Sequence, residues 1–403
     1  MTSPTSKPAD ETLRDPRNFS LALGGPLFQL LRWAHLSDDA LTMVKGRVLV
    51  ISLFAWLPLL MLSALGGQLL GGGTAVPFLK DVDVHVKLLV VIPLLIVSEL
   101  VMHMRMRPLV GQFLDQDLIP ESARARFDAA VASALRIRNS VLAEVLLIAF
   151  VYGFGILVVW RHFMVLETTT WYATPSAGGT TLSLPGMWFG FVSLPILQFL
   201  LCRWLFRLFI WARFLWQVSR LDLNLVPTHP DRAGGLGFLS NVLSAFMPLA
   251  AAFGAMIAGV LANRIFYSGA RLPDFKAQIA AGVILLVLAF VGPLLVFAPR
   301  LAQAKRTGLL EYGVMAQRYV RGFDAKWLRG GAPADAPLVG SPDIQSLADL
   351  ANSFEVVRSM RMAPLAMQDV ILVAIAALVP IAPLLLTVMP LDELLKLALS
   401  LLR

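Results

Sequence analysis

The chain has 403 residues, of which 57% are hydrophobic and only 15% are charged, whereas soluble domains carry roughly 25% charged residues. A water-soluble core could not bury that much apolar surface, so this composition excludes an ordinary soluble protein and assigns much of the chain to lipid. The net charge of +8 does not indicate nucleic-acid binding, because no basic stripe alternates with aromatic residues that could stack on bases.

The N-terminal segment 1–47 is expected on the cytoplasmic side of the membrane. Its first eighteen residues are polar and contain acidic side chains, so we expect neither a cleaved signal peptide nor a mitochondrial transit peptide. Residues 19–36 are apolar but too short to cross a bilayer and are interrupted by Gly24, Gly25 and Pro26. This segment is predicted to form a helix in the membrane interface.

Long uncharged runs dominate the rest of the sequence. They fill 48–79, 168–202, 233–263, 277–299 and 370–391. A helix needs roughly 20 apolar residues to cross the bilayer core, so each run is long enough for one crossing.

Two further crossings are interrupted by a carboxylate, Glu99 in one and Glu144 in the other. The prediction is therefore an all-α, polytopic membrane protein with about seven transmembrane helices. They are expected at about 48–70, 88–106, 141–163, 187–211, 239–261, 277–298 and 369–390.

The distribution of basic residues predicts the orientation. With the N-terminus in the cytoplasm, the inner segments contain 24 Lys and Arg residues and the outer segments contain 8. Such a bias is typical of cytoplasmic loops and leaves the C-terminus outside. Arginine outnumbers lysine 26 to 8, which favours a GC-rich bacterial genome and hence a bacterial inner membrane.

Most of the extramembrane chain is predicted to be cytoplasmic and helical. The region of the first four crossings, 48–211, includes a cytoplasmic helical hairpin at 107–140 that connects crossings two and three. This hairpin contains the amphipathic segment 121–139. A Pro/Gly elbow, 212–238, precedes crossings five and six (239–298). The segment 299–368 contains a second amphipathic helix at 344–361, whose cap is Ser341 or Asp343. Crossing seven and an interfacial tail complete the chain (369–403), and the longest outer segment, 167–186, is predicted to be a loop.

Five ionisable residues fall in the inner half of the predicted membrane. They are Glu99, His103, Glu144, Arg203 and Arg207. Because charges at this depth are costly unless paired or hydrated, we expect Glu99 and Glu144 to meet Arg203, with His103 nearby. The functional interpretation is an anion-binding or proton-coupled site that opens to the cytoplasm. The structural alternative is an ion-pair cluster that joins crossings two, three and four.

The elbow carries the most distinctive polar string, NLVPTHPDRAGGLGFLSN. We expect Asp231 to cap a new helix whose first turn contains Arg232, while Gly234 and Gly235 allow close approach by another backbone or by an anion. His229 and Asp231 have a spacing suited to acid–base work but no third partner in sequence. A rigid elbow that holds cytoplasmic helices together is the favoured interpretation.

Prolines and small residues add two further observations. Six crossings contain an interior proline: Pro58, Pro93, Pro195, Pro248, Pro293, and Pro380 with Pro383. Bent helices can enclose a cavity or act as hinges. Crossing five also has Ala255 and Gly259 four residues apart, which permits close helix packing within the chain or between two copies.

Three classes of function remain open. The leading hypothesis is a channel or secondary transporter for a small ion or metabolite. The second is a membrane-anchored signalling or scaffold protein whose amphipathic helices bind a cytoplasmic partner. The third, a membrane-embedded enzyme, is disfavoured because no nucleophile–base set stands out and Cys202 is the only cysteine. We expect no catalytic residues, no metal site and no cofactor.

Overall fold

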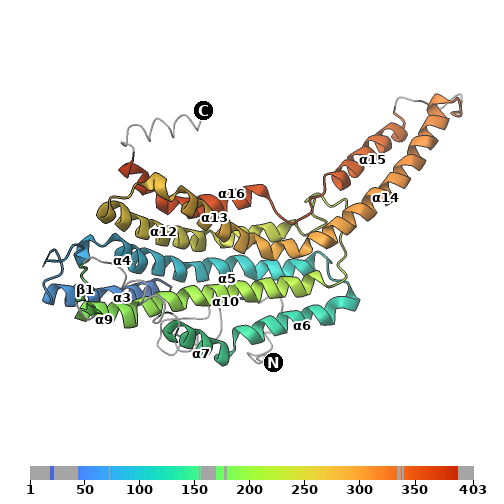
Figure 1. Cartoon of the computed structure of the whole chain (residues 1–403). Coiled ribbons are helices and arrows are strands. Elements are labelled where there is room, and N and C mark those ends of the chain that lie inside the picture. The colour runs from blue at the N-terminus through green and yellow to red at the C-terminus, as the bar shows by residue number, and fades with distance from the viewer. Residues whose placement is uncertain are drawn as a thin grey trace, which may run out of the picture.

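The computed structural model describes residues 19–21, 44–71, 73–153, 155, 169–176, 179–333, 337 and 340–388. These residues form a bundle of long helices that run roughly along one common axis (Figure 1). Most of the predicted interfacial helix 19–36, the outer part of crossing three and the tail 391–403 lie outside the described residues.

Six helical segments are long and apolar enough to cross a membrane, by length and composition: Val44–Leu65, Val82–Asp115, Leu184–Ser219, Met247–Ser268, Leu272–Leu328 and Met367–Thr387. They match six of the seven predicted crossings. The remaining one begins as the shorter apolar segment Val141–Gly153, which contains α7 (Val141–Phe150). The chain is therefore a polytopic, all-α membrane protein.

The helices in chain order are α3 (Val44–Leu65), α4 (Val82–Val86), α5 (Ile92–Asp115), α6 (Glu121–Arg138), α7, α9 (Leu184–Trp188), α10 (Leu194–Ser219), α11 (Asn241–Ala245), α12 (Met247–Ser268), α13 (Lys276–Val291), α14 (Ala298–Phe323), α15 (Pro342–Arg358) and α16 (Met367–Leu378). In Figure 1, α12, α13 and α16 lie on one side of α5 and α10, and α6 and α7 lie on the other.

Prolines interrupt these long helices at defined places. A π-helical turn, Lys87–Val91, precedes Pro93, and a second one, Phe189–Ser193, precedes Pro195. A 3₁₀ segment, Gly292–Phe297, joins α13 to α14 and contains Pro293. Proline lacks the N–H that an α-helix needs and its ring clashes with the preceding turn, so the helix locally changes pitch.

Three of the continuous helical segments are longer than a bilayer is thick, and the longest, Leu272–Leu328, has 57 residues. Val82–Asp115 has 34 residues and Leu184–Ser219 has 36, or about 50 Å each at 1.5 Å per residue. The hydrocarbon core is about 30 Å thick, and α3 has only 22 residues. At this length, we expect Val82–Asp115 and Leu184–Ser219 to extend beyond the hydrocarbon core. Crossing two also begins earlier than predicted, at Val82 instead of 88, so Asp83 and Lys87 belong to it.

The loops gather at two ends of the bundle, as the predicted topology requires. At one end Val76 pairs with Thr170 in a short β-bridge, and the Tyr267 hydroxyl donates to the carbonyl of Lys80 at 2.7 Å. At the other end the amide of Asn224 donates to the carbonyl of Leu118 at 2.9 Å. The grouping of loops is thus confirmed, while the assignment of this second end to the cytoplasm remains a prediction.

The outer segment 167–186 is not only a loop, as predicted. It contains the antiparallel hairpin β1 (Ala173–Ser176) and β2 (Gly179–Leu182), and then the start of α9 at Leu184. Trp171, which precedes this hairpin in the chain, is fully buried. Its burial has a tertiary cause, because Asp81 from another segment accepts the indole N–H.

An aromatic core holds the extension beyond the predicted inner membrane boundary together. The ring of Phe113 in α5 packs against Phe127 of α6, Phe238 and Phe297, at centroid distances of 5.1 to 6.4 Å. Burying such a side chain from water contributes roughly 1.5–3 kcal/mol. The predicted apolar face of segment 121–139 is confirmed, since Phe127, Val131 and Leu135 are all buried.

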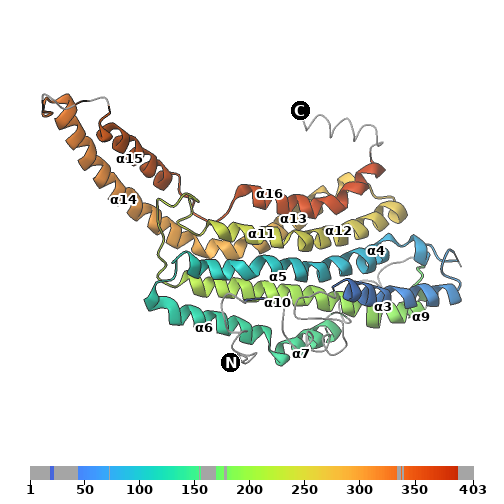
Figure 2. The ribbon, with the colours of Figure 1, turned by 180° about the vertical axis from the view of Figure 1, so that it is seen from behind.

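Helices α14 and α15 form an antiparallel hairpin that projects from this same end, as both views show (Figure 2). The predicted cap of α15 is Ser341, whose hydroxyl accepts the amide of Asp343 at 3.2 Å. The hairpin is fastened near its tip, where Lys326 and Trp327 both donate to the Asp343 carboxylate at 2.6 and 2.8 Å.

The small-residue face of α12 is covered by the same chain, so it is not an exposed surface for a second copy. A methyl group added to Gly254 would lie 1.9 Å from the carbonyl oxygen of Ala377 in α16. One added to Gly259 would lie 3.1 Å from the Asp83 carboxylate. Gly259 of the predicted pair thus allows the close approach of α12 to α4, whereas the approach to α16 uses the neighbouring Gly254.

Candidate functional site

Three arginines surround one carboxylate at the centre of the bundle. Glu99 of α5 lies 2.7 Å from Arg47 of α3, 2.8 Å from Arg207 of α10 and 3.7 Å from Arg203. All four side chains are at most 7% exposed. We call these four residues the Glu99 cluster.

The helices place the Glu99 cluster by simple spacing. Arg203 and Arg207 are four residues apart on α10 and therefore share one face. Between them Trp204 donates its indole N–H to the carbonyl of Leu95 at 3.0 Å and lies 5.0 Å from the Arg207 guanidinium. This indole fixes the rotation of α10 against α5, so both arginines point toward Glu99.

The cluster carries more positive charge than Glu99 can balance. Beside it, Arg138 and Glu144 share a cavity of about 10 Å³ with Arg203 and Arg207, which is about the volume that one water needs. Four buried arginines thus face two buried glutamates. Burial lowers the pKa of Arg138 to about 10, which leaves it charged at neutral pH.

The predicted pairing was partly wrong. Glu99 does meet Arg203, but its shorter contacts are to Arg207 and to Arg47, which sequence reasoning missed. Arg47 immediately precedes the first uncharged run, 48–79, and looked like an ordinary flanking charge. No local signal distinguishes it, because its burial depends on how α3 packs against α5.

The other two predicted residues sit at the edge of this region. Glu144 is 9% exposed and lines the small cavity together with Arg203. His103 does not join Glu99, although the two are one turn apart. Its Nδ1 lies 2.9 Å from the hydroxyl of Ser20, and the carbonyl of Ser20 accepts from Arg138. The described part of the N-terminal segment thus packs into the bundle.

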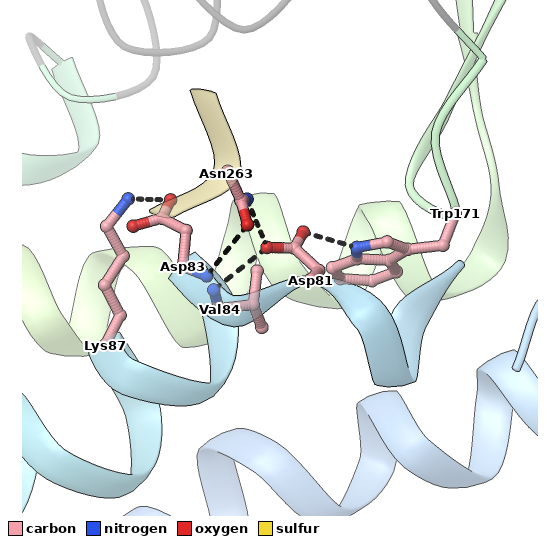
Figure 3. Close-up of polar contacts among 6 residues, drawn as sticks. All are labelled: Asp81, Asp83, Val84, Lys87, Trp171 and Asn263. Carbon is pink, nitrogen blue, oxygen red and sulfur yellow. Dashed lines mark hydrogen bonds and ion pairs between the residues drawn. The ribbon is translucent and has the colours of Figure 1, made fainter. Parts of the chain in front are cut away.

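A second polar cluster lies at the N-terminal end of the helical segment Val82–Asp115, which also carries Glu99 (Figure 3). The Asp81 carboxylate accepts the indole N–H of Trp171 at 2.8 Å and the side-chain amide of Asn263 at 2.7 Å. One helical turn on, Lys87 donates to Asp83 at 2.5 Å. Sequence reasoning placed these acidic residues in an outer loop and did not single them out.

The elbow is folded around Asp231. Its carboxylate accepts the amides of Ala233 and Gly237 at 2.7 Å and of Gly235 at 3.2 Å. Burial opposes ionisation of this carboxyl, but the three backbone donors outweigh it and hold the pKa of Asp231 below its ordinary value. His229 adds a contact at 2.9 Å.

The predicted helix start at Asp231 was wrong. The backbone at Arg232, Gly234 and Gly235 is left-handed, with φ of 54°, 65° and 97°, which breaks any helix there. The first helical turn begins only at Gly237. Because the Gly235 and Gly237 amides donate to Asp231, they do not face an external anion in this conformation.

Main-chain carbonyl groups of the elbow accept hydrogen bonds from a segment that is distant in sequence. Arg361, which follows α15, donates its amide to the carbonyl of Arg232 and its guanidinium to the carbonyl of Asp231, both at 2.7 Å. These contacts join the elbow to the connection between α15 and α16. They agree with the interpretation of this loop as a rigid elbow.

Within the described ranges, no group of three or more His, Cys, Asp or Glu side chains is arranged to hold a metal ion. The expected absence of a catalytic set and of a cofactor stays a prediction. Compared with known protein families, curated proteins and solved structures, the chain matches none of them.

Proposed function

We propose that this chain is a secondary transporter for a small anion, and that the Glu99 cluster is where the anion is held. The observation that carries the proposal is the surplus of buried positive charge around Glu99 and Glu144. A buried charge without a partner is costly, so a site with four arginines and two glutamates favours an additional anion.

Free donors in the cluster support the same proposal. Among the described residues, the buried Nη1 atoms of Arg203 and Arg207 have no hydrogen-bond partner. Guanidinium groups suit carboxylate and phosphate oxygens, which they can bind in a bidentate manner. An oxyanion would satisfy donors that the protein itself leaves unused.

The geometry between the two polar clusters favours a transporter over an open channel. From Lys87 to Glu99 is 12 residues of helix, or about 18 Å. The side chains of Leu88, Val91, Ile92, Leu95 and Ile96 along it are all 0% exposed. This apolar layer seals the path, so an ion could pass only if the helices moved. The π-helical turns before Pro93 and Pro195 offer hinges for such motion.

The test is anion flux into liposomes that contain the purified protein, across chloride, phosphate and small carboxylates. We expect uptake that Arg203→Ala and Glu99→Gln abolish. Arg213→Ala is the matched control, because Arg213 lies on the same helix but donates to Ser133 of α6 outside the cluster. Flux that persists in both cluster variants, or is absent across the panel with folded protein, would overturn the proposal.

A partner-binding scaffold remains the second candidate, favoured by the α14–α15 hairpin. On α14, Leu310 and Val314 are 72% and 54% exposed, and Leu328, in the π-helical turn that follows α14, is 71% exposed. The same hairpin has a cavity of about 460 Å³, whose lining includes Met315, Tyr319 and Phe323 together with the charged side chains of Arg318, Lys326 and Asp343. Such exposed apolar side chains on a projecting element often mark an interaction surface.

This candidate predicts a defined protein that co-purifies in mild detergent and is lost when residues 344–361 are deleted. Leu310→Glu should also release that protein, and Leu310→Gln at the same position separates the loss of the apolar side chain from a mere charge effect. Recovery of the chain alone would count against a scaffold and leave the transport proposal unaffected.

A further inference from the structure

A slot between α3, α7 and α10 opens beside the Glu99 cluster. Its volume is about 460 Å³, within the range of roughly 300–1,000 Å³ usual for small-molecule sites. The walls include Val50 and Phe54 of α3, Val151 and Tyr152 of the α7 segment, and Ile196 of α10. Apart from Arg47 and the Tyr152 hydroxyl, the lining side chains are apolar.

Arg47 forms the one charged end of this slot. Its Nη2 atom donates to Glu99, while Nε and Nη1 are buried and have no hydrogen-bond partner among the described residues. The side chain is 2% exposed, so bulk water does not satisfy these donors. An unpaired buried donor costs about 1–3 kcal/mol, and an anionic oxygen from a ligand would remove that cost.

The slot runs from the predicted membrane interface toward the bilayer midplane, as a lipid molecule does. Arg47 lies in the first turn of α3, next to exposed Lys45 at the predicted inner interface. Phe54 is seven residues further along the helix, about 10 Å toward the bilayer midplane. Phe54, Ile148 and Tyr152 are 53%, 47% and 47% exposed, so the slot is open sideways, where acyl chains surround the protein.

We propose that this slot binds an acyl chain that ends in an anionic group. The carboxylate or phosphate lies at Arg47, and the chain runs between α3, α7 and α10. Anionic phospholipids of the inner leaflet and free fatty acids share this chemistry. This proposal is independent of the transport proposal. A lipid bound at Arg47 would accept hydrogen bonds from its unpaired donors whether or not the chain transports an anion.

Native mass spectrometry of the delipidated full chain in detergent tests the site. The probes are phosphatidylglycerol, palmitic acid, and phosphatidylcholine with the same acyl chains as phosphatidylglycerol. We expect phosphatidylglycerol or palmitic acid to bind at least tenfold more tightly than phosphatidylcholine. Val151→Phe, which fills the slot, should weaken binding tenfold or more. Val145→Phe is the matched control, because Val145 is on α7, 54% exposed, and outside the slot.

The role of Arg47 in binding the anionic group is tested with Arg47→Gln. This substitution is combined with Glu99→Gln, so that one buried positive and one buried negative charge are removed together. We expect this double variant to lose the preference for anionic probes. Ile196→Phe narrows the slot from α10 and gives a second reading if Val151→Phe does not fold. Equal binding by the slot-filling variants and the native chain would overturn the proposal. No preference for an anionic probe in the native chain would overturn the role of Arg47.

Discussion

Arg47 and Glu99 are 52 residues apart in the chain, and Nη2 of one lies 2.7 Å from Oε2 of the other. This ion pair joins the first crossing helix to the second. Because Glu99 also faces Arg207 and Arg203 of α10, one carboxylate links three helices. Its removal would leave three arginines together in a space from which water is largely excluded.

Glu99→Gln should therefore destabilise the protein strongly. Breaking a buried ion pair from one side typically costs 3–5 kcal/mol, and reversible unfolding in mixed micelles measures the change. Glu121→Gln, at the exposed start of α6, should change little. A loss below about 1 kcal/mol for Glu99→Gln, well under that typical cost, would contradict a dry cluster.

Trp171→Phe should weaken the opposite end of the bundle. The substitution keeps an aromatic ring beneath the β-hairpin but removes the N–H that donates to Asp81 at 2.8 Å. A hydrogen bond to a charged group contributes roughly 1.5–3 kcal/mol. The free energy of unfolding measures this loss. Trp216→Phe is the control, since Trp216 is 49% exposed; an equal loss in both variants would contradict a specific bond.

Gly254→Ala should disrupt the contact between α12 and α16. The added methyl would lie 1.9 Å from the carbonyl of Ala377, so the two helices would have to separate. Gly46→Ala, in α3, meets nothing within 4 Å and should be neutral or slightly stabilising, because alanine favours helices by up to about 1 kcal/mol. The midpoint of thermal unfolding in detergent should fall for Gly254→Ala and stay the same or rise slightly for Gly46→Ala.

The elbow should become less stable in acid. The backbone donors around Asp231 hold its pKa below the ordinary value, so ionised Asp231 stabilises the fold above the ordinary Asp pKa of about 3.9. This contribution falls as pH drops through the lowered folded-state pKa.

Asp231→Asn should remove that pH dependence, which proteolysis of the elbow as a function of pH measures. Asp222→Asn is the control on the same side of the bundle, because Asp222 is 83% exposed. Identical acid sensitivity of Asp231→Asn and the native chain would show that Asp231 does not stabilise the loop by its charge.

The orientation can be measured with single cysteines. In a Cys202→Ala background, Ser268→Cys lies at the predicted outer end of α12 and Ser346→Cys lies on α15 at the predicted inner end. Both serines are exposed. In intact cells an impermeant maleimide should label position 268 and leave 346 unlabelled until lysis. The reverse pattern would invert the predicted topology.

Crossing helices could be predicted from sequence because the length of an uncharged apolar run is a local property. Six of the seven appear at the predicted positions within the described residues, and the amphipathic face of 121–139 is buried as expected. The start of crossing two was placed too late, since Asp83 and Lys87 looked incompatible with a membrane helix. Their charges are satisfied by each other, which depends on helix geometry rather than on composition.

By itself, the sequence determined that this chain is threaded through lipid, because water could not solvate its long apolar runs. Only the tertiary structure decided which charges meet. Glu99 selects Arg47 and Arg207 through the packing of α3, α5 and α10, and Asp231 folds its own loop instead of starting a helix. The reason is that burial and partner choice depend on helix rotation and on contacts between distant segments, which no single stretch of sequence encodes.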